Sequence, residues 1–237
     1  MSCAESSKDF LLSTIANLHE SGAYSDFKIV CGSDTYNVHK NIICPQSDFF
    51  RAACRPDTFQ EGQTGVVTIL ANAGRDRDTL RKALTPDEYD WDQDVEDVEA
   101  VRAMIYYFYH HDYHADRVSD HARMYAMGEK YGIQALKALA DKKFRQSFAD
   151  GRGDRETAIV IAFTSTPDSD RVLRATIISG LGAPAMLGET LRMDETIKKI
   201  PDLVYPLYRR FLWRHYRSLE TTLHVALGID AEPDDSL

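Results

Sequence analysis

Apolar residues near the N-terminus recur at the spacing of a short amphipathic helix over residues 6–20. Three of them share one helical face: Leu11, Ile15 and Leu18. Ser6 and Asp9 have the spacing of a capping box, so we expect the helix to begin at this serine. Ser21 and Gly22 follow the last apolar position and end the helical pattern.

Short β-strands are predicted after this helix. Residues 26–31 and 35–38 alternate apolar and polar positions, and the Gly-Ser-Asp sequence between them is a hairpin-type turn. A third run, residues 66–70, has four apolar residues in five, and we expect a strand that is buried on both faces. Two short helical patterns separate the hairpin from this strand: residues 41–47 and 48–54.

From residue 98 onward the apolar positions recur at helical spacing, interrupted by glycine and proline. The expected helices are residues 98–111, 119–131, 133–148, 154–166, 168–180, 188–199 and 202–226. A Gly-Arg-Gly sequence at residues 151–153 is predicted to be a linker. The expected organisation has four parts: an N-terminal helix in residues 1–19, a mixed domain over 20–148, a helical region over 154–228 and a disordered tail over 229–237.

Residues 71–94 interrupt this regular pattern. They mix Gly74, Pro86 and alternating arginine and aspartate with few apolar residues. We expect a long surface loop here, with one helical turn around residues 79–84.

The acidic residues are concentrated in one segment. The chain has 28 Lys and Arg against 37 Asp and Glu, which gives a formal net charge of -9. One run contains eight acids and no base: Asp87, Glu88, Asp90, Asp92, Asp94, Glu96, Asp97 and Glu99. The rest of the chain is nearly neutral, whereas phosphate surfaces are bound by clustered Lys and Arg. We therefore expect neither a nucleic acid nor an anionic membrane as a partner.

The cellular compartment is predicted from the uncharged runs, the N-terminus and the cysteines. Runs without a charged residue, such as 157–167 and 175–188, are shorter than the ~18–20 apolar residues of a transmembrane helix. The first ten residues have no basic segment followed by an apolar one, and the four cysteines include no Cys-x-x-Cys pair. These features are typical of an intracellular protein with reduced thiols, which we expect in the cytoplasm, the nucleus or both.

Two groups of residues have spacings that occur in metal sites. Asp90, Asp92 and Asp94 match the first three ligands of an EF-hand loop, but valines occupy the positions of its glycine and its glutamate. We favour a solvated acidic loop, with weak cation binding as the alternative. His110 and His114 have an i,i+4 spacing that could hold zinc, but the predicted helix ends between them and no cysteine is near. We favour exposed histidines at the negative end of the helix dipole.

The sequence contains no motif for catalysis. A nucleophile elbow, a phosphate-binding glycine loop and a zincin motif are all absent from it. A Cys-His nucleophile is the remaining option, but Cys31, Cys44 and Cys54 lie in apolar stretches where core packing is the usual role. We therefore predict no catalytic residue, no cofactor, no metal and no small-molecule substrate.

Arginines and aromatic residues interleave near the C-terminus. The residues are Tyr208, Arg209, Arg210, Phe211, Trp213, Arg214, Tyr216 and Arg217. Such a pattern could stack on and grip a nucleic acid. We favour an amphipathic helix, because four arginines supply only a few phosphate contacts. Along this helix, the residues expected to pass between core and surface are Leu203, Leu207, Phe211, Arg214 and Leu219.

The order of strands and short helices, together with several motifs, resembles the BTB/POZ domain family. The motifs at matching spacing are Tyr24–Ile29, Tyr36–Lys40, Ser47–Ala52, Phe59–Gly62 and Val66–Ile69. Two later stretches resemble the family's third helix and the helix after it: residues 98–113 and 126–139. The resemblance covers residues 20–148 and is greatest to short fungal BTB proteins. It implies an α+β fold, with a small β-sheet flanked by a cluster of short helices, followed here by an all-α C-terminal region.

The resemblance also implies functional positions. In the family, an aspartate and a basic residue at the places of Asp26 and Lys40 line a charged pocket near the dimer interface, and His39 belongs to the same fold signature. Because Asp26 opens a strand and Lys40 opens a helix, the carboxylate is expected to meet the basic group or the helix start. Phe59 and Glu61 match the hydrophobic-x-Glu element with which cullin-binding members hold their ligase scaffold. A buried anchor and a helix cap are the alternative roles for this pair.

The sequence departs from the family pattern in two places. Residues 71–94 are inserted where the family has a short acidic turn, and a regulatory loop and a gene-model error would both explain them. The insertion lies near the surface where a cullin would dock, which weakens the cullin hypothesis. His110 and His111 replace the family's Thr-Gly, so we expect a different turn there.

These observations lead to one main hypothesis and two alternatives. The main hypothesis is a non-catalytic protein interaction module that forms a homodimer, with Leu11, Ile15 and Leu18 of the N-terminal helix at the interface. The first alternative is a substrate adaptor of a cullin-RING ubiquitin ligase, in which residues 154–237 would recruit the substrate. The second alternative is a transcriptional corepressor scaffold.

Overall fold

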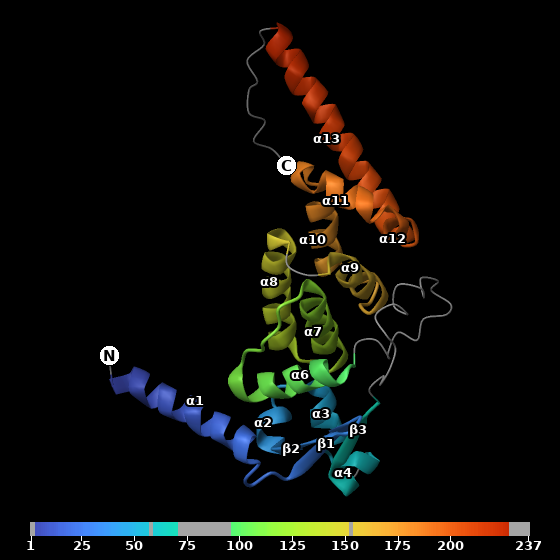
Figure 1. Cartoon of the computed structure of the whole chain (residues 1–237). Helices are drawn as coiled ribbons and strands as arrows, with labels where there is room; N and C mark the ends of the chain where they lie inside the picture. Colours follow the sequence, from blue (N-terminus) through green and yellow to red (C-terminus); the bar gives the residue numbers. More distant parts are fainter. Residues whose placement is uncertain (1–2, 57–58, 71–95, 152–153, 228–237) are drawn as a thin grey trace. The chain divides into compact units, whose positions relative to one another are not determined.

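The described residues of the computed structural model fall into two compact units, Met1–Arg174 and Ala175–Leu237 (Figure 1). The structure describes residues 3–56, 59–70, 96–151 and 154–227. The predicted loop over residues 71–94 and the predicted C-terminal tail lie outside them. None of the described helices is long and apolar enough to cross a membrane.

The N-terminal helix α1 spans Cys3–Ser21 and packs against α6, Val98–His110. It begins before Ser6, so this serine lies inside the helix and the predicted capping box is wrong. The physical reason is local, because the alanine and glutamate that precede Ser6 are strong helix formers. Near the other end of α1, the ring of His19 lies parallel to the ring of Tyr109, with 4.9 Å between the ring centroids.

Three strands form one sheet with the order β2-β1-β3. They are β1 (Phe27–Cys31), β2 (Asp34–Val38) and β3 (Val66–Ile69). The strand β1 pairs antiparallel with β2 through the predicted hairpin and parallel with β3. Alternate side chains of β1 are buried, as the apolar-polar alternation predicts.

The edge strand β3 is covered on one face only. Val67 and Ile69 are buried, whereas Thr68 between them is exposed and Leu70 beyond them is 80% exposed. The prediction of a strand buried on both faces is therefore wrong, because this edge strand buries only the side chains on one side of the pleat.

Short helices connect β2 to β3. They are α2 (Lys40–Ile43), α3 (Asp48–Ala53) and α4 (Gln60–Thr64). The helix α4 was not predicted, because its Gln-Glu-Gly-Gln-Thr sequence has no apolar residue to show a period. Ser47 caps α3 by accepting a hydrogen bond from the Phe50 N–H at 3.2 Å, and it donates to the carbonyl oxygen of Tyr131 at 2.6 Å.

Longer helices complete the first unit. After α6 come α7 (Val118–Lys130), α8 (Gln134–Asp150) and α9 (Arg155–Thr164). Most of α7 is buried, because α6, α8 and α9 all pack against it. The helices α7 and α8 approach closely at Gly128, where a Cβ atom would lie 2.8 Å from the backbone nitrogen of Lys137. The first unit thus continues beyond the predicted linker at residues 151–153.

The second unit is helical. The helix α10 (Val172–Leu181) crosses the boundary, and after it come the short η1 turn (Pro184–Met186), α11 (Leu187–Arg192), α12 (Asp194–Lys198) and α13 (Pro201–Leu227). The expected α+β class, with a small sheet, short helices and a helical C-terminal region, is confirmed.

Two details of the predicted C-terminal helices are wrong. The helix expected over residues 168–180 starts at Val172, because a turn precedes it. The helix expected over residues 188–199 is interrupted at Met193, which is buried and leaves the helical conformation. The expected passage from core to surface along α13 is observed: Leu203 and Leu207 are buried, whereas Leu219 is 57% exposed and lies on the opposite side of the helix.

Candidate protein interaction site

The helix α1 carries exposed apolar side chains. Leu11 is 59% exposed, and its neighbours Phe10 and Leu12 are 74% and 39% exposed. The other predicted interface residues, Ile15 and Leu18, are half-buried where α1 approaches α6. Sequence reasoning missed Phe10 and Leu12 because they lie on either side of the regular helical stripe. This helix therefore exposes several large apolar side chains close together in the chain, a feature found at interaction sites.

A cluster of aromatic rings holds the end of α1 on α6. In addition to its stack on Tyr109, the His19 ring meets the His110 ring edge-on, with 5.5 Å between centroids. The His110 ring in turn stacks on Tyr106 with a centroid distance of 3.8 Å. Burial is the main cause that lowers the pKa of both His19 and His110, so both imidazoles favour the neutral form.

The prediction of exposed histidines at the end of α6 is therefore wrong for His110. This residue is half-buried, and α1 covers it, which the sequence could not show because the two helices are far apart in the chain. The helix ends as expected at this point, since His111 takes the left-handed conformation with φ 52°. Within the described ranges, no three His, Cys, Asp or Glu side chains converge to hold a metal ion.

His39 forms a buried link between the hairpin and α6. Its Nε2 lies 2.7 Å from the carbonyl oxygen of Ala23, and since a carbonyl only accepts, this nitrogen carries the proton. In the neutral ring Nδ1 then accepts a hydrogen bond from the Tyr109 hydroxyl, at 2.8 Å. The same hydroxyl oxygen accepts the backbone N–H of His39 at 3.0 Å. Burial raises the pKa of Tyr109 to about 12, so this donor keeps its proton at neutral pH.

Asp26 and Lys40 meet at the start of α2. The Asp26 carboxylate accepts the backbone N–H of Lys40 at 2.8 Å, so the helix start is the contact that forms, as one of the two expected options. The Lys40 ammonium lies over the ring of Phe27, 5.4 Å from its centroid. Asp26 and Lys40 are thus linked through a helix cap, and the lysine adds a cation–π contact. The charged pocket near a dimer interface stays a prediction.

Phe59 and Glu61 lie together at the start of α4. Phe59 is the residue before the helix and is 50% exposed, and Glu61 lies in the first turn. The alternative of a buried anchor does not apply to Phe59 at this exposure. The helix ends at Gly65, which adopts a φ of 69° and donates its N–H to the Glu61 carbonyl at 2.8 Å.

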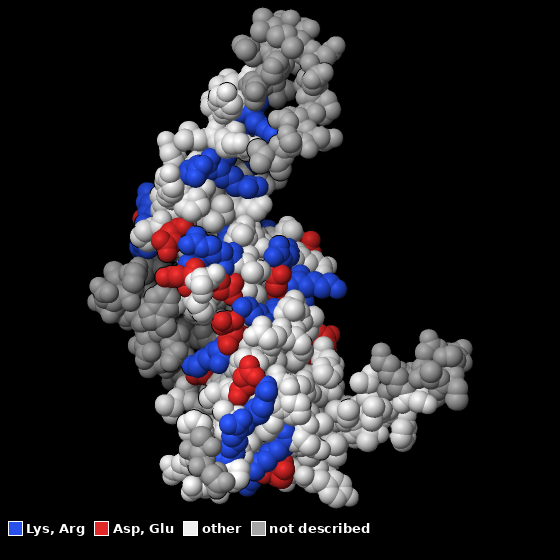
Figure 2. Space-filling model, turned by 180° about the vertical axis from the view of Figure 1, so that it is seen from behind, with Lys and Arg blue, Asp and Glu red and all other residues white. Residues whose placement is uncertain are grey.

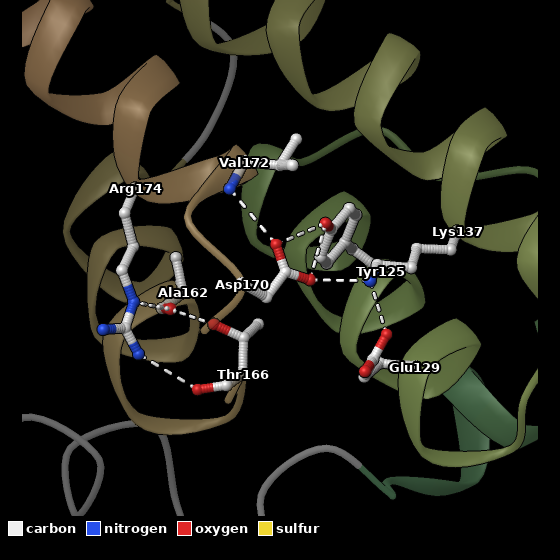
Figure 3. A network of polar contacts seen from close by, with 8 residues as sticks. All are labelled: Tyr125, Glu129, Lys137, Ala162, Thr166, Asp170, Val172 and Arg174. Carbon is white, nitrogen blue, oxygen red and sulfur yellow. Dashed lines mark hydrogen bonds and ion pairs between the residues drawn. The ribbon is translucent and has the colours of Figure 1, made fainter. Parts of the chain in front are cut away.

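A polar network fixes the segment after α9 to the helices α7 and α8 (Figure 3). The Asp170 carboxylate accepts the Tyr125 hydroxyl at 2.8 Å, the Lys137 ammonium at 2.7 Å and the Val172 backbone N–H at 3.1 Å. Lys137 also binds Glu129. Burial is the largest single influence and alone would raise the pKa of Asp170 and lower that of Lys137. Their mutual hydrogen bond, the other hydrogen bonds and the opposite charges together outweigh it, so the pKa of Asp170 is lowered and that of Lys137 is raised. The pair therefore stays ionised, and α7, α8 and the start of α10 are joined.

Arg174 makes a second link in the same region. Its side chain is 7% exposed, and its guanidinium donates to the carbonyl oxygens of Phe163 at 3.4 Å and Thr166 at 3.0 Å, at the end of α9. Five donors in one planar group suit these converging carbonyls. Sequence reasoning missed both networks, although charged residues within an apolar helical region were a signal for them.

The end of the acidic run has structural roles. Asp97 caps α6 by accepting the Ala100 N–H at 2.6 Å, and it pairs with Arg123 at 2.8 Å. Glu96 is 7% exposed, accepts the Tyr131 hydroxyl and pairs with Lys130 at 3.2 Å. Asp97 thus stabilises the start of α6, and both acids connect this start to α7 and the residue after it.

Charges of both signs share the visible surface. On the face drawn in Figure 2, basic side chains alternate with acidic ones over the middle of the molecule. Among the described residues, Arg102 pairs with two acids: it contacts Asp34 at 2.8 Å and Glu99 at 2.8 Å. This part of the described surface therefore presents no long basic stripe of the kind that follows a phosphate backbone.

Residues 15–72 match the family model described as BTB/POZ domain. The match runs from the second half of α1 through β3, and it includes Asp26, His39, Lys40, Phe59 and Glu61. No curated protein sequence matches the chain. Domains of this family mediate protein–protein interactions.

Proposed function

We propose that this chain, which carries a BTB/POZ domain, is a non-catalytic interaction module that associates with a second copy of itself through α1. The observation that carries the proposal is the exposed apolar surface of α1, formed by Phe10, Leu11 and Leu12. We expect the protein to be located in the cytoplasm, the nucleus or both.

The free energy expected from burying these apolar side chains supports a stable pair. Burying one exposed Phe or Leu side chain stabilises a complex by about 1.5–3 kcal/mol. Phe10 and Leu11 from two copies therefore supply several kcal/mol before the cost of association. Leu11→Asp removes two such contributions and introduces two charges, which weakens association by roughly a hundredfold or more.

Light scattering of the full chain, combined with hydrogen exchange, tests this proposal. The wild type is expected to show a mass above the monomer value of 26.8 kDa, and exchange within α1 is expected to slow as protein concentration rises. Leu11→Asp is expected to abolish this slowing. The matched control is Ser13→Asp, which adds the same charge to an exposed position on the side of α1 opposite Leu11 and is expected to keep it. Exchange within α1 that does not respond to concentration in the wild type would refute the proposal.

A second candidate function is that of an adaptor for a cullin-RING ubiquitin ligase. It is favoured by the exposure of Phe59, which leaves an aromatic side chain available beside the Glu61 carboxylate. An apolar side chain beside a charge is a combination found at interface hot spots. In this role the helices after the BTB domain would recruit the substrate. The corepressor scaffold would differ from the adaptor in its partner, and it remains a prediction.

A pull-down with a purified cullin tests the adaptor function. The double variant Phe59→Ala/Glu61→Ala is expected to lose capture, whereas Leu70→Ala, which truncates another exposed apolar side chain, is expected to keep it. Equal capture of the wild type and the double variant, or no capture of either, would exclude the adaptor role.

A further inference from the structure

The long helix α13 is apolar on two opposite sides. On its inner side Leu203 and Leu207 are buried. Arg210 and Arg214 donate hydrogen bonds from this side to α10 and to the residue just after it. The inner side therefore accounts for the packing of α13 within the second unit.

The outer side carries a second apolar stripe. We name its five residues the outer stripe: Tyr205, Tyr208, Leu212, Tyr216 and Leu219. Each of them is at least half exposed, from 50% for Leu212 to 67% for Tyr216. At 3.6 residues per turn they fall within a sector of about 80°, opposite the buried leucines. A stripe of this kind on an exposed helix is typical of a helix–helix contact.

The outer stripe has a symmetric spacing. Two tyrosines lie four residues before and four residues after Leu212, and Tyr205 and Leu219 lie seven residues to either side of it. Two identical surfaces that meet about a twofold axis must be complementary to themselves. When two such helices run antiparallel and cross at Leu212, Tyr208 of each copy faces Tyr216 of the other. In the same way, Tyr205 of each copy faces Leu219 of the other. We propose that the outer stripe is the contact surface for α13 of a second copy of this chain, paired antiparallel about Leu212.

The exposed area is sufficient for such a pair. If a tyrosine side chain has about 200 Å², the three tyrosines of the outer stripe expose roughly 380 Å², and the two leucines bring the total to roughly 500 Å². Two copies would then bury about 1,000 Å², the lower limit for a specific interface.

The charges beside the stripe agree with the antiparallel direction. Arg209 borders the stripe three residues before Leu212. In an antiparallel pair it comes opposite the region of Tyr216 in the other copy, where a guanidinium is attracted to the face of the ring. In a parallel pair the two copies of Arg209 would face each other and repel. This contact goes beyond the proposed function, because it uses a different helix from the BTB surface.

Hydrogen exchange of the full chain as a function of concentration tests the pairing. At a protein concentration about ten times the dissociation constant, exchange over residues 205–219 is expected to slow by about tenfold. Leu212→Asp is expected to abolish this slowing. Leu191→Asp, which changes a 67% exposed leucine of α11, is expected to keep it. Exchange over residues 205–219 that is independent of concentration would overturn the proposal, because the stripe would then be covered within one chain or by another class of partner.

The result does not depend on the proposed α1 contact. In a Leu11→Asp background the protection of residues 205–219 is expected to persist, whereas α1 loses its own protection. The direction of pairing is tested by cysteine cross-linking with mass-spectrometric identification of the linked peptides. Leu212→Cys is expected to link to itself, and Tyr205→Cys to Leu219→Cys. A link between two copies of Tyr205→Cys, without the link to position 219, would overturn the antiparallel arrangement.

Discussion

Replacing Tyr109 by phenylalanine is expected to destabilise the first unit by about 3 kcal/mol, because it removes the hydroxyl that serves both the N–H and the Nδ1 of His39. The substitution keeps the ring, and with it the stack on His19. Only 4% of His39 and 1% of Tyr109 are exposed, so water does not replace the lost partner. A buried polar group left without a partner costs about 1–3 kcal/mol, and here two groups are affected.

Urea titration followed by circular dichroism measures this loss as a shift in midpoint at constant slope. In thermal unfolding, the same loss corresponds to a decrease of about 6–12 °C for a unit of this size. Tyr106→Phe is the matched control one turn earlier on α6. Its ring stacks on His110, and the described residues provide no hydrogen bond to its hydroxyl, so we expect a change below about 0.5 kcal/mol. Equal stability of the two variants would refute the role assigned to the Tyr109 hydroxyl.

Other predictions concern the network around Asp170, the closest approach of α7 and α8, and the histidines under α1. Asp170→Asn is expected to lower the unfolding free energy by about 3 kcal/mol, because it leaves the Lys137 ammonium without its buried partner. Asp116→Asn, at an exposed carboxylate, is expected to have little effect in the same urea titration. Gly128→Ala is expected to cost about 1–3 kcal/mol, because the new methyl group meets the backbone of α8 rather than a movable side chain. The folded protein lowers the pKa of His19 and His110 below the unfolded-state value of 6.5. Their contribution to the unfolding free energy is therefore fully present above pH 6.5 and is lost as the pH falls through their folded-state pKa. Urea midpoints should therefore fall more between neutral pH and pH 5 in the wild type than in a variant with both His19 and His110 replaced by glutamine; equal falls would contradict the prediction.

The features that sequence could predict are those that depend on neighbouring residues. The hairpin follows from alternation and a turn sequence, and the contact of Asp26 with the start of α2 follows from a carboxylate that precedes a helix. The family motifs added the order of the short helices, which periodicity alone does not give. For α4 even periodicity is absent, because the helix has no apolar residue.

The features that sequence could not predict depend on pairs that are distant along the chain. Tyr109 is 70 residues from His39, and Asp170 is 45 residues from Tyr125, so no local pattern connects either pair. The two faces of α13 are an intermediate case. Its apolar residues were visible, but only the burial of Leu203 and the exposure of Leu219 show that they belong to opposite sides.

The connection from β3 to α6 has two ends that are fixed by contacts of described residues. These contacts do not depend on the length of the connection. Ile69 ends a strand inside the sheet, and Glu96 is fixed by Tyr131 and Lys130 at the other end. The following residue, Asp97, caps α6 with its own carboxylate. None of these contacts uses residues 71–95, so a transcript that encoded a shorter segment would still contain these anchoring groups. The β3–α6 connection is therefore a position at which evolution or a protein engineer can change the length of the chain without removing either anchor.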